Sequence, residues 1–326
     1  MGFGIVRVLG LVALLFLATP AQAEWYEASS DNFVIYADDS EKDIRKFAEN
    51  LERFHQAMEI ATGRKLEKPS PSNRVTIYVV GDERDIDRLV GAKNSNIAGF
   101  YVPRAGGSVA FVQDIRFSSG YPSFSTVVLL HEYAHHFLIA SSRYAMPRWM
   151  SEGAAEFFAA AGFDSNGTVR VGRPAQHRAG ELYYATEVSV AELLDHDLYL
   201  KRSGKAYDAF YGRSWLLFHY LTFSEARKGQ LSQYWVELAR GAPAVEAARK
   251  VFGDIDALEK ELDKYLKQRR MYEFVIQANA IKVGPIALRA LSAGEAKAMP
   301  LVIRSKRGVD EREAAEVVAE MRKVAA

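Results

Sequence analysis

The hydrophobic period of the sequence changes near Ser123, and this change limits the folds that the chain can adopt. Before Ser123, short runs such as DNFVIYA (31–37) and RVTIYVV (74–80) have the alternation or the β-branched content of strands. After it, apolar residues recur at spacings of three and four, which is typical of helices. We therefore expect an α+β fold, with a small mixed β-sheet and its helices first, followed by a mainly helical part.

Several segments carry a sharper secondary-structure signal. Residues 41–62 have a helical stripe of apolar side chains, with Ser40 as the expected N-cap and Gly63 just beyond the end. The runs at 99–102 and 108–113 predict two strands joined by a turn. The clearest helical patterns of the second part are SFSTVVLLHEYAHHFLIA, PRWMSEGAAEFFAAAG and YDAFYGRSWLLFHYLTF.

The first 23 residues have the pattern of a secretory signal peptide. Arg7 precedes an apolar stretch at 8–18, and Ala-Gln-Ala at 21–23 matches a small-residue cleavage site. The stretch is short for a membrane span, although an uncleaved N-terminal anchor is the alternative. The chain has no cysteine, which excludes a lipid-modified cysteine and cysteine-ligated zinc. We predict a periplasmic or secreted protein without a stable membrane anchor after cleavage.

The charge balance argues against a polyanionic partner. The chain has 42 basic and 41 acidic side chains, and loss of Arg7 with the signal peptide would make these numbers equal. We therefore predict no nucleic-acid partner. We expect a domain over 24–270, divided into a mixed α/β part at 24–115 and a helical part at 116–270, and a C-terminal appendage of unknown function at 271–326.

The segment HEYAH has the spacing of a zinc site. On a helix, His131 and His135 lie one above the other on the same face, so both imidazoles can reach one ion. Glu132 is one position away from this ligand stripe, where its carboxylate can take a proton from zinc-bound water. So short a pattern also arises by chance, and a buried helix with hydrogen-bonded histidines is the alternative.

A catalytic zinc ion needs a third protein ligand and an open fourth position. Seventeen residues after His135, PRWMSEGAAEFF places Glu152 on a second expected helix, after a break that permits a helix-turn-helix return. Glu156 is four residues further along the same face, where it can accept the free N–H of a ligand imidazole. The flanking apolar residues predict a buried helix, in which unpaired carboxylates are costly. We therefore predict a Zn²⁺ site with Glu152 as third ligand and Glu156 behind the histidines.

HEYAH followed by WMSEGAAEFF resembles the gluzincin metallopeptidases, and within them the bacterial peptidase MA-like domains. The resemblance is strongest over 125–160 and implies a zincin-like catalytic part with zinc as cofactor and a peptide or protein as substrate. His131, His135 and Glu152 match the zinc ligands of the family. Glu132 matches its general base, and Glu156 matches the carboxylate behind the ligands.

The resemblance also implies a tyrosine that donates a hydrogen bond to the oxyanion formed during peptide hydrolysis. In aminopeptidase members of the clan, a Tyr-x-Lys-Gly segment opens the helix that carries this tyrosine. YGRSWLLFHYL is similar, with Tyr211 at the tyrosine position, Arg213 for the lysine and Ser214 for the glycine. Tyr207, one turn earlier, is the alternative donor.

Zincins pair the substrate backbone with an edge strand that precedes the active-site helix, and 108–113 is the corresponding segment here. Aminopeptidases of the clan place a glutamate near this strand to hold the substrate amine, and GGSVAFVQD contains none. The resemblance therefore favours an endopeptidase. We expect His136 to be a packed or hydrogen-bonded bystander. The other histidines are predicted to be surface or capping residues: His55, His177, His196 and His219.

Together these features predict an exported zinc metallopeptidase that hydrolyses peptide bonds with zinc-activated water and with Glu132 as general base. The alternative is a catalytically silent peptide-binding or envelope-assembly module on a metallopeptidase scaffold. A structural zinc with four protein ligands is a third interpretation. The sequence predicts no particular oligomeric state.

Overall fold

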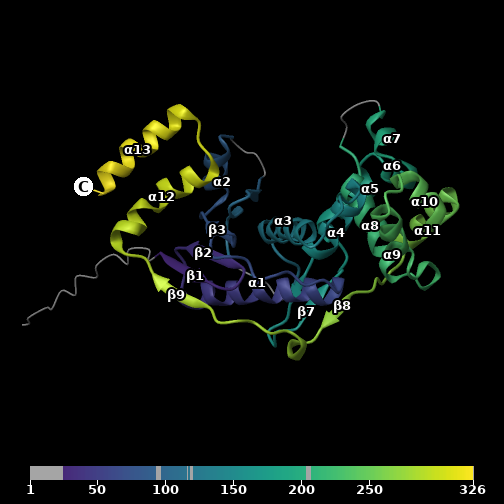
Figure 1. The fold of residues 1–326 in the computed structure, drawn as a ribbon, viewed down its shortest axis with the longest axis horizontal. Helices are drawn as coiled ribbons and strands as arrows, with labels where there is room; N and C mark the ends of the chain where they lie inside the picture. The colour runs from purple at the N-terminus through teal and green to yellow at the C-terminus, as the bar shows by residue number, and fades with distance from the viewer. Residues whose placement is uncertain (1–24, 93–96, 116, 118–119, 203–206, 326) are drawn as a thin grey trace, which may run out of the picture.

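The computed structural model describes residues 25–92, 97–115, 117, 120–202 and 207–325, so the expected signal peptide lies outside the described residues. Within these ranges, a six-stranded mixed β-sheet with its covering helices forms one end of the molecule, and a helical part forms the other (Figure 1). The predicted fold class, a mixed sheet with helices followed by mainly helical structure, is confirmed.

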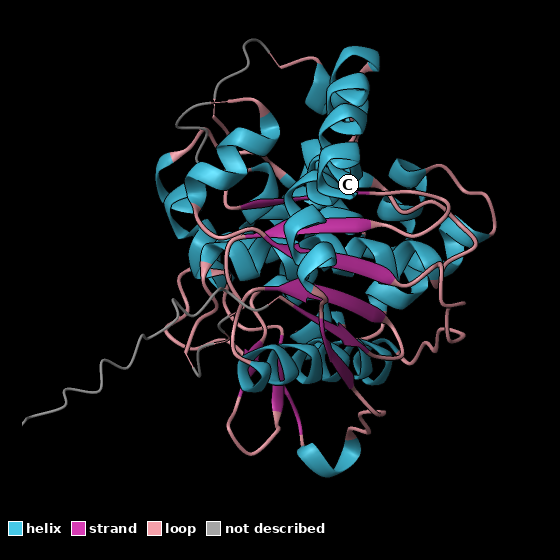
Figure 2. Ribbon diagram, turned by 90° about the vertical axis from the view of Figure 1, so that its left-hand side faces the viewer, coloured by secondary structure: helices cyan, strands magenta, loops and turns pink. Residues whose placement is uncertain are grey.

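The large sheet has the strand order β4-β5-β3-β2-β1-β9. Figure 2 shows its strands side by side, with helices around them. β2, β3 and β5 run parallel, and the other neighbours pair antiparallel. Side chains alternate between the two faces, so that in β3 Ile77 belongs to one hydrophobic core and Tyr78 to the other. Helices α1 and α3 cover the first face, and α2 and α12 cover the second. The elements of this part are β1 (Tyr26–Ser29), β2 (Phe33–Ala37), α1 (Glu41–Thr62), β3 (Val75–Val79), α2 (Glu83–Val90), β4 (Gly99–Val102), β5 (Val109–Val112), α3 (Phe124–Ala140), β9 (Ala287–Ala290) and α12 (Ala293–Arg307).

The first long helix, α1, begins and ends where the sequence predicts. The backbone N–H of Asp43 donates to Ser40 Oγ at 3.2 Å, which caps the N-terminus. Gly63 has a left-handed φ of +65°, a conformation that ends helices and that favours glycine. The stripe that includes Phe47 and Phe54 is buried against the sheet and α3.

The helical part surrounds α4 and α8 and includes a small antiparallel sheet in the order β6-β7-β8. Among the described residues, no helix is long and apolar enough to cross a membrane. The elements of this part are α4 (Arg148–Ala159), β6 (Gly162–Phe163), β7 (Val169–Val171), the 3₁₀ turn η1 (Gln176–Arg178), α5 (Ala179–Tyr184), α6 (Val190–Leu194), α7 (His196–Leu200), α8 (Phe210–Phe223), the 3₁₀ turn η2 (Glu225–Arg227), α9 (Gln230–Ala239), α10 (Ala244–Phe252), α11 (Ile255–Leu266) and β8 (Phe274–Ile276).

The segment after Met271 runs back from the helical part to the large sheet (Figure 1). β8 pairs with β7, and beyond the 3₁₀ turn η3 (Ala278–Ala280) β9 pairs with β1 at the edge of the large sheet. Met299 and Ile303 of α12 are buried in the core on the second face of that sheet, and α13 (Glu311–Ala325) packs on α12. Backbone hydrogen bonds therefore tie the expected appendage to both sheets.

The strand that was expected to bind substrate is not at a sheet edge. β5 lies within the segment 108–113, between β3 and β4, and pairs with both. The edge strand on this side is β4, because the hairpin folds the earlier strand outside the later one. The prediction of an edge strand at 108–113 is therefore wrong, and β4 takes that place.

α4 and α8 pack side by side in the same direction at very short range. Arg148 contacts Phe210 at their starts, and the rings of Phe157 and Phe218 lie 5.4 Å apart further along. Between these contacts, a Cβ added to Gly153 would lie 2.4 Å from the backbone oxygen of Ser214. A glycine is therefore required here, since only a missing side chain allows the two helix backbones to approach so closely.

Replacing Gly153 with alanine should push α8 away from α4, because the opposing backbone oxygen cannot rotate out of the way. We expect the free energy of unfolding to fall by about 1–3 kcal/mol, as for overpacked cores, measured by urea denaturation. Gly294→Ala is the control, because a Cβ on this helical glycine of α12 meets nothing within 4 Å. Equal stability of the two variants would contradict the close-packing argument.

Candidate metal centre

Helix α3 carries the HEYAH segment with one side buried and the other half-buried. Its N-terminus is capped by Ser123, whose Oγ accepts the N–H of Thr126 at 3.3 Å. Leu130, Tyr133 and Phe137 pack into the main core. The polar residues of the motif therefore line the half-buried side: His131, Glu132, His135 and His136.

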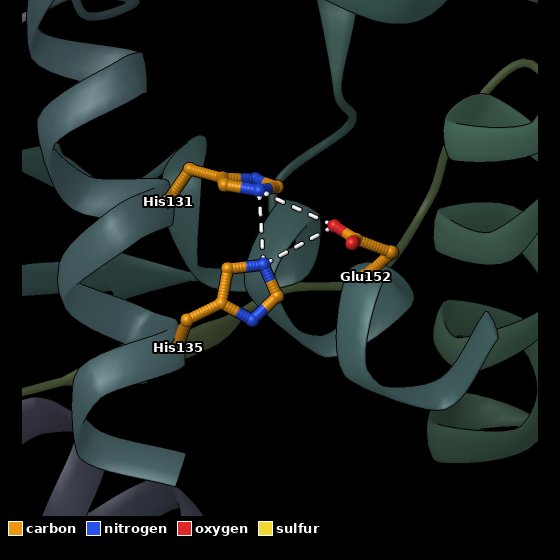
Figure 3. A group of neighbouring side chains, drawn as sticks. All are labelled: His131, His135 and Glu152. Atoms are coloured by element: carbon orange, nitrogen blue, oxygen red, sulfur yellow. Dashed lines mark hydrogen bonds and ion pairs between the residues drawn. The ribbon is translucent and has the colours of Figure 1, made fainter. Parts of the chain in front are cut away.

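Three donor atoms from α3 and α4 converge (Figure 3). His135 Nε2 lies 3.1 Å from His131 Nε2 and 3.1 Å from Glu152 Oε2, and His131 Nε2 lies 3.4 Å from the same carboxylate oxygen. These residues form a group that could hold a metal ion. The structure thus brings together the three residues that were predicted as ligands.

The spacing of the donors suits zinc. Zinc in proteins is usually tetrahedral, with nitrogen and oxygen ligands at 2.0–2.2 Å, so two of its ligand atoms lie roughly 3.3 Å apart along a tetrahedron edge. The separations of 3.1–3.4 Å among His131, His135 and Glu152 match this edge. Among the described residues the group contains these three donors.

The second nitrogen of each histidine also has a neighbour. His131 Nδ1 lies 3.1 Å from Glu156 Oε1, which is the contact predicted for Glu156. His135 Nδ1 lies 3.2 Å from Ser151 Oγ, a contact that the sequence did not indicate. With Nε2 bound to an ion, each Nδ1 would carry the proton and turn it outward toward this neighbour, which would fix the orientation of the ring.

Glu156 is fully buried, and partners from outside α3 and α4 compensate its charge. Its carboxylate lies 2.5 Å from His177 Nε2 and accepts a hydrogen bond of 2.5 Å from Arg178. Burial alone would raise the pKa of Glu156, but hydrogen bonds with His131, His177 and Arg178 outweigh it and hold the pKa well below its usual range. The expectation that His177 is a surface or capping residue is therefore wrong.

Glu152 and His131 form a coupled pair next to this buried charge. Burial disfavours the charged forms of both side chains. Contacts with His131 and His135 nevertheless lower the pKa of Glu152 to about 2. The two carboxylates in turn raise the pKa of His131 to about 9. In the metal-free protein, His131 is therefore protonated at neutral pH, and its positive charge is stabilised by Glu152 and Glu156.

Glu132 is the residue that the sequence predicts as the general base. It follows His131 on the half-buried side of α3. In the part of the chain that the structure describes, its carboxylate takes part in no hydrogen bond or ion pair. A nearby water could therefore use this carboxylate as an acceptor without competition.

Of the two candidate tyrosines, Tyr211 faces the centre. Its ring centroid lies 6.4 Å from that of His131, and the guanidinium of Arg178 lies 4.8 Å from its ring. Tyr207 is 68 % exposed, and no ring contact joins it to the histidines in the described residues. The geometry thus favours Tyr211 as the side chain on the α8 wall. Arg213 and Ser214, which match the lysine and the glycine of the family segment, do not line the centre. Arg213 forms ion pairs with acids of α11, and Ser214 packs on α4.

The remaining histidines have structural contacts. His136 stacks on Tyr133, and its Nδ1 lies 3.0 Å from the hydroxyl of Tyr101 in β4, as a hydrogen-bonded bystander would. His55 and His219 are buried, which contradicts their expected place at the surface. Burial lowers the pKa of His219 to about 4, so this histidine is neutral near neutral pH.

A second acidic group in the helical part is already neutralised. Glu187, Glu259 and Asp263 lie close enough together to hold an ion. Buried Arg213, however, donates to Asp263 at 2.8 Å and to Glu259. A guanidinium thus occupies the position that a cation would take, and this group provides a control for the metal centre.

Loss of a ligand should abolish metal binding without affecting the second acidic group. We expect His135→Ala and Glu152→Gln to lower the affinity for Zn²⁺ by roughly a hundredfold or more, measured by chelator competition. Asp263→Asn should bind zinc like the unmodified protein. If the ligand variants keep one tightly bound zinc per chain, the assignment is wrong.

Zinc binding should release protons. His131 without metal has a pKa of about 9, so it is protonated at pH 7 and must lose that proton to become a ligand. Affinity should therefore rise with pH, by up to about tenfold per unit between pH 7 and 9. Titration calorimetry in buffers with different ionisation enthalpies will count the protons; an affinity independent of pH would contradict the proposed state of His131.

Comparison with known proteins adds one match. A family model described as "Protein of unknown function (DUF1570)" matches residues 124–244, just over a third of the chain. The matched region begins with α3 and includes every predicted ligand as well as Tyr211. No curated protein matches the chain. The chain is therefore similar to this family over the segment that builds the metal centre.

Proposed function

We propose that the protein is an exported zinc metallopeptidase of the gluzincin type that hydrolyses peptide bonds. The observation that carries the proposal is the donor triangle of His131, His135 and Glu152, spaced for a tetrahedral ion. Glu132 follows His131 on α3, and its carboxylate has no hydrogen-bond or ion-pair partner among the described residues. Three protein ligands leave one position open, which is typical of catalytic zinc sites. The resemblance of HEYAH and WMSEGAAEFF to the gluzincins supports the same conclusion.

Zinc in such a site polarises the substrate carbonyl and makes water more acidic. Glu132 would accept the proton of the attacking water on its carboxylate and deliver it to the leaving amine. Its lack of other partners among the described residues supports this role, because a carboxylate already held by a cation would be a weaker base. His131 and His135 would keep their orientation through Glu156 and Ser151.

Tyr211 would donate its phenolic hydrogen to the oxyanion from the α8 wall. Such a donor must be held in place before the charge develops. The guanidinium groups of Arg178 and Arg148 lie 4.8 Å and 5.9 Å from its ring and limit its movement. Gly153 contributes indirectly, because the close approach of α8 to α4 sets the position of Tyr211 relative to Glu152.

The edge strand β4 supports a peptide as the substrate. Its outer edge pairs with no described strand, so an extended peptide can add to the sheet by main-chain hydrogen bonds. The contact between Tyr101 and His136 ties this strand to α3 beside the ligand pair. A peptide bound along β4 would therefore pass the metal centre. Chain-internal cleavage and a periplasmic or extracellular location are parts of the same proposal.

Glu132→Gln separates catalysis from metal binding. We expect this variant to bind one zinc per chain but to lose about 10²–10⁴-fold in kcat on a peptide library, because the proton acceptor is removed. Glu67→Gln, a change at an exposed site in the loop between α1 and β3, is the matched control. Turnover by Glu132→Gln at the rate of the unmodified protein would refute the general-base assignment. An unmodified protein that binds zinc and peptides without cleaving them would instead be a peptide-binding module.

A further inference from the structure

Arg148 lies on the same face of α4 as the metal ligand Glu152, four residues before it. Four residues correspond to one turn, or about 6 Å along the helix axis. Arg148 is exposed, so a molecule that binds at the metal centre can reach its guanidinium. The structure thus places a cationic side chain one helical turn from the ligand triangle.

Aromatic rings hold this guanidinium in place. It lies 4.2 Å from the ring centroid of Phe210, 5.6 Å from that of Tyr199 and 5.9 Å from that of Tyr211. Stacking on rings fixes the plane of an arginine while leaving its N–H groups available at the edges. Because the side chain is already ordered, Arg148 loses less conformational entropy when it binds a ligand.

Arg148 differs from the neighbouring arginines in having no carboxylate partner. Arg178 is paired with Glu156 and Glu181, and Arg213 with acids of α11. In the described part of the chain, no ion pair involves Arg148, whose partners are the phenols of Tyr211 and Tyr199. A guanidinium has five N–H donors, so two phenols leave most of them available.

We propose that Arg148 binds a carboxylate of the substrate and is the residue that determines specificity for acidic ligands. The inference rests on the proposed peptidase function and defines its substrate class further. A planar guanidinium can bind a carboxylate through two parallel hydrogen bonds. Because Arg148 lies one helical turn before Glu152, the bound carboxylate belongs near the scissile bond. It is either an Asp or Glu side chain or the C-terminal carboxylate of the peptide.

Binding to the zinc-loaded Glu132→Gln protein tests this inference without turnover. The probes are fluorescein-labelled peptides in matched pairs, with Asp or Asn at each position and with a C-terminal acid or amide. Fluorescence anisotropy gives the Kd of each member. We expect at least one acidic peptide to bind roughly tenfold more tightly than its neutral partner. Pairs that differ at a side chain and pairs that differ at the terminus distinguish the two sources of the carboxylate.

Variants then assign the preference to Arg148. Adding Arg148→Gln should reduce the ratio of the two Kd values to about one, whereas Arg148→Lys should retain part of it through its charge. Arg143→Gln is the control, because it removes the same charge from an exposed site in the loop before α4 and should preserve the ratio. Zinc content and thermal melting of each variant must match those of the parent.

Equal binding of all acidic and neutral partners, or a ratio that survives Arg148→Gln, would overturn the inference. The outcome for the proposed function is read separately, from cleavage by the protein with Glu132 intact. A preference for acidic peptides without any cleavage would leave the carboxylate site standing and remove the peptidase assignment. Cleavage without a preference for acidic peptides would support the peptidase assignment and overturn the carboxylate site.

Discussion

The buried carboxylate of Glu156 is the interaction on which the rest of the centre depends. A carboxylate removed from water is costly unless charged or hydrogen-bonding groups surround it. Two parts of the chain supply these groups for Glu156. His131 lies on α3, and His177 and Arg178 lie in the turn that follows β7. Because α4 carries both Glu156 and Glu152, the contacts that compensate the buried charge also set the distance between the ligand carboxylate and α3.

Helix α4 links this charge to the other walls of the centre. Gly153 lets α8 approach closely, and α8 carries Tyr211 toward His131. Arg178 continues the connection, because it contacts both Glu156 and the ring of Tyr211. The same helix presents the candidate ligand Glu152 and, one turn earlier, Arg148, whose guanidinium has no carboxylate partner among the described residues. In the proposed peptidase, a single rigid element would therefore position both the metal and the group that selects the substrate.

The local pattern of the sequence was sufficient to predict the residues within each helix. Four-residue spacing on a helix is a geometric constant, so the histidine pair and the pair of glutamates could be recognised without a structure. Contacts between distant segments could not be recognised in this way. His177 and Ser151 reach the site across 21 and 16 residues, without any periodic relation to their partners. The edge strand was assigned wrongly for a related reason, since the order of strands in a sheet depends on how a hairpin folds and not on the pattern of either strand.

By itself, the sequence determined the fold class, the main helices of the centre and the chemical types of the ligands, because hydrophobic period and ligand spacing are properties of single elements. Only the tertiary structure decided that Glu152 meets both histidines, that the charge of Glu156 is compensated by a distant turn, and that Arg148 has no acidic partner among the described residues. The physical reason is that these features depend on the packing of helices against one another. That packing follows from long-range burial and from close approach at positions such as Gly153, which no local spacing encodes.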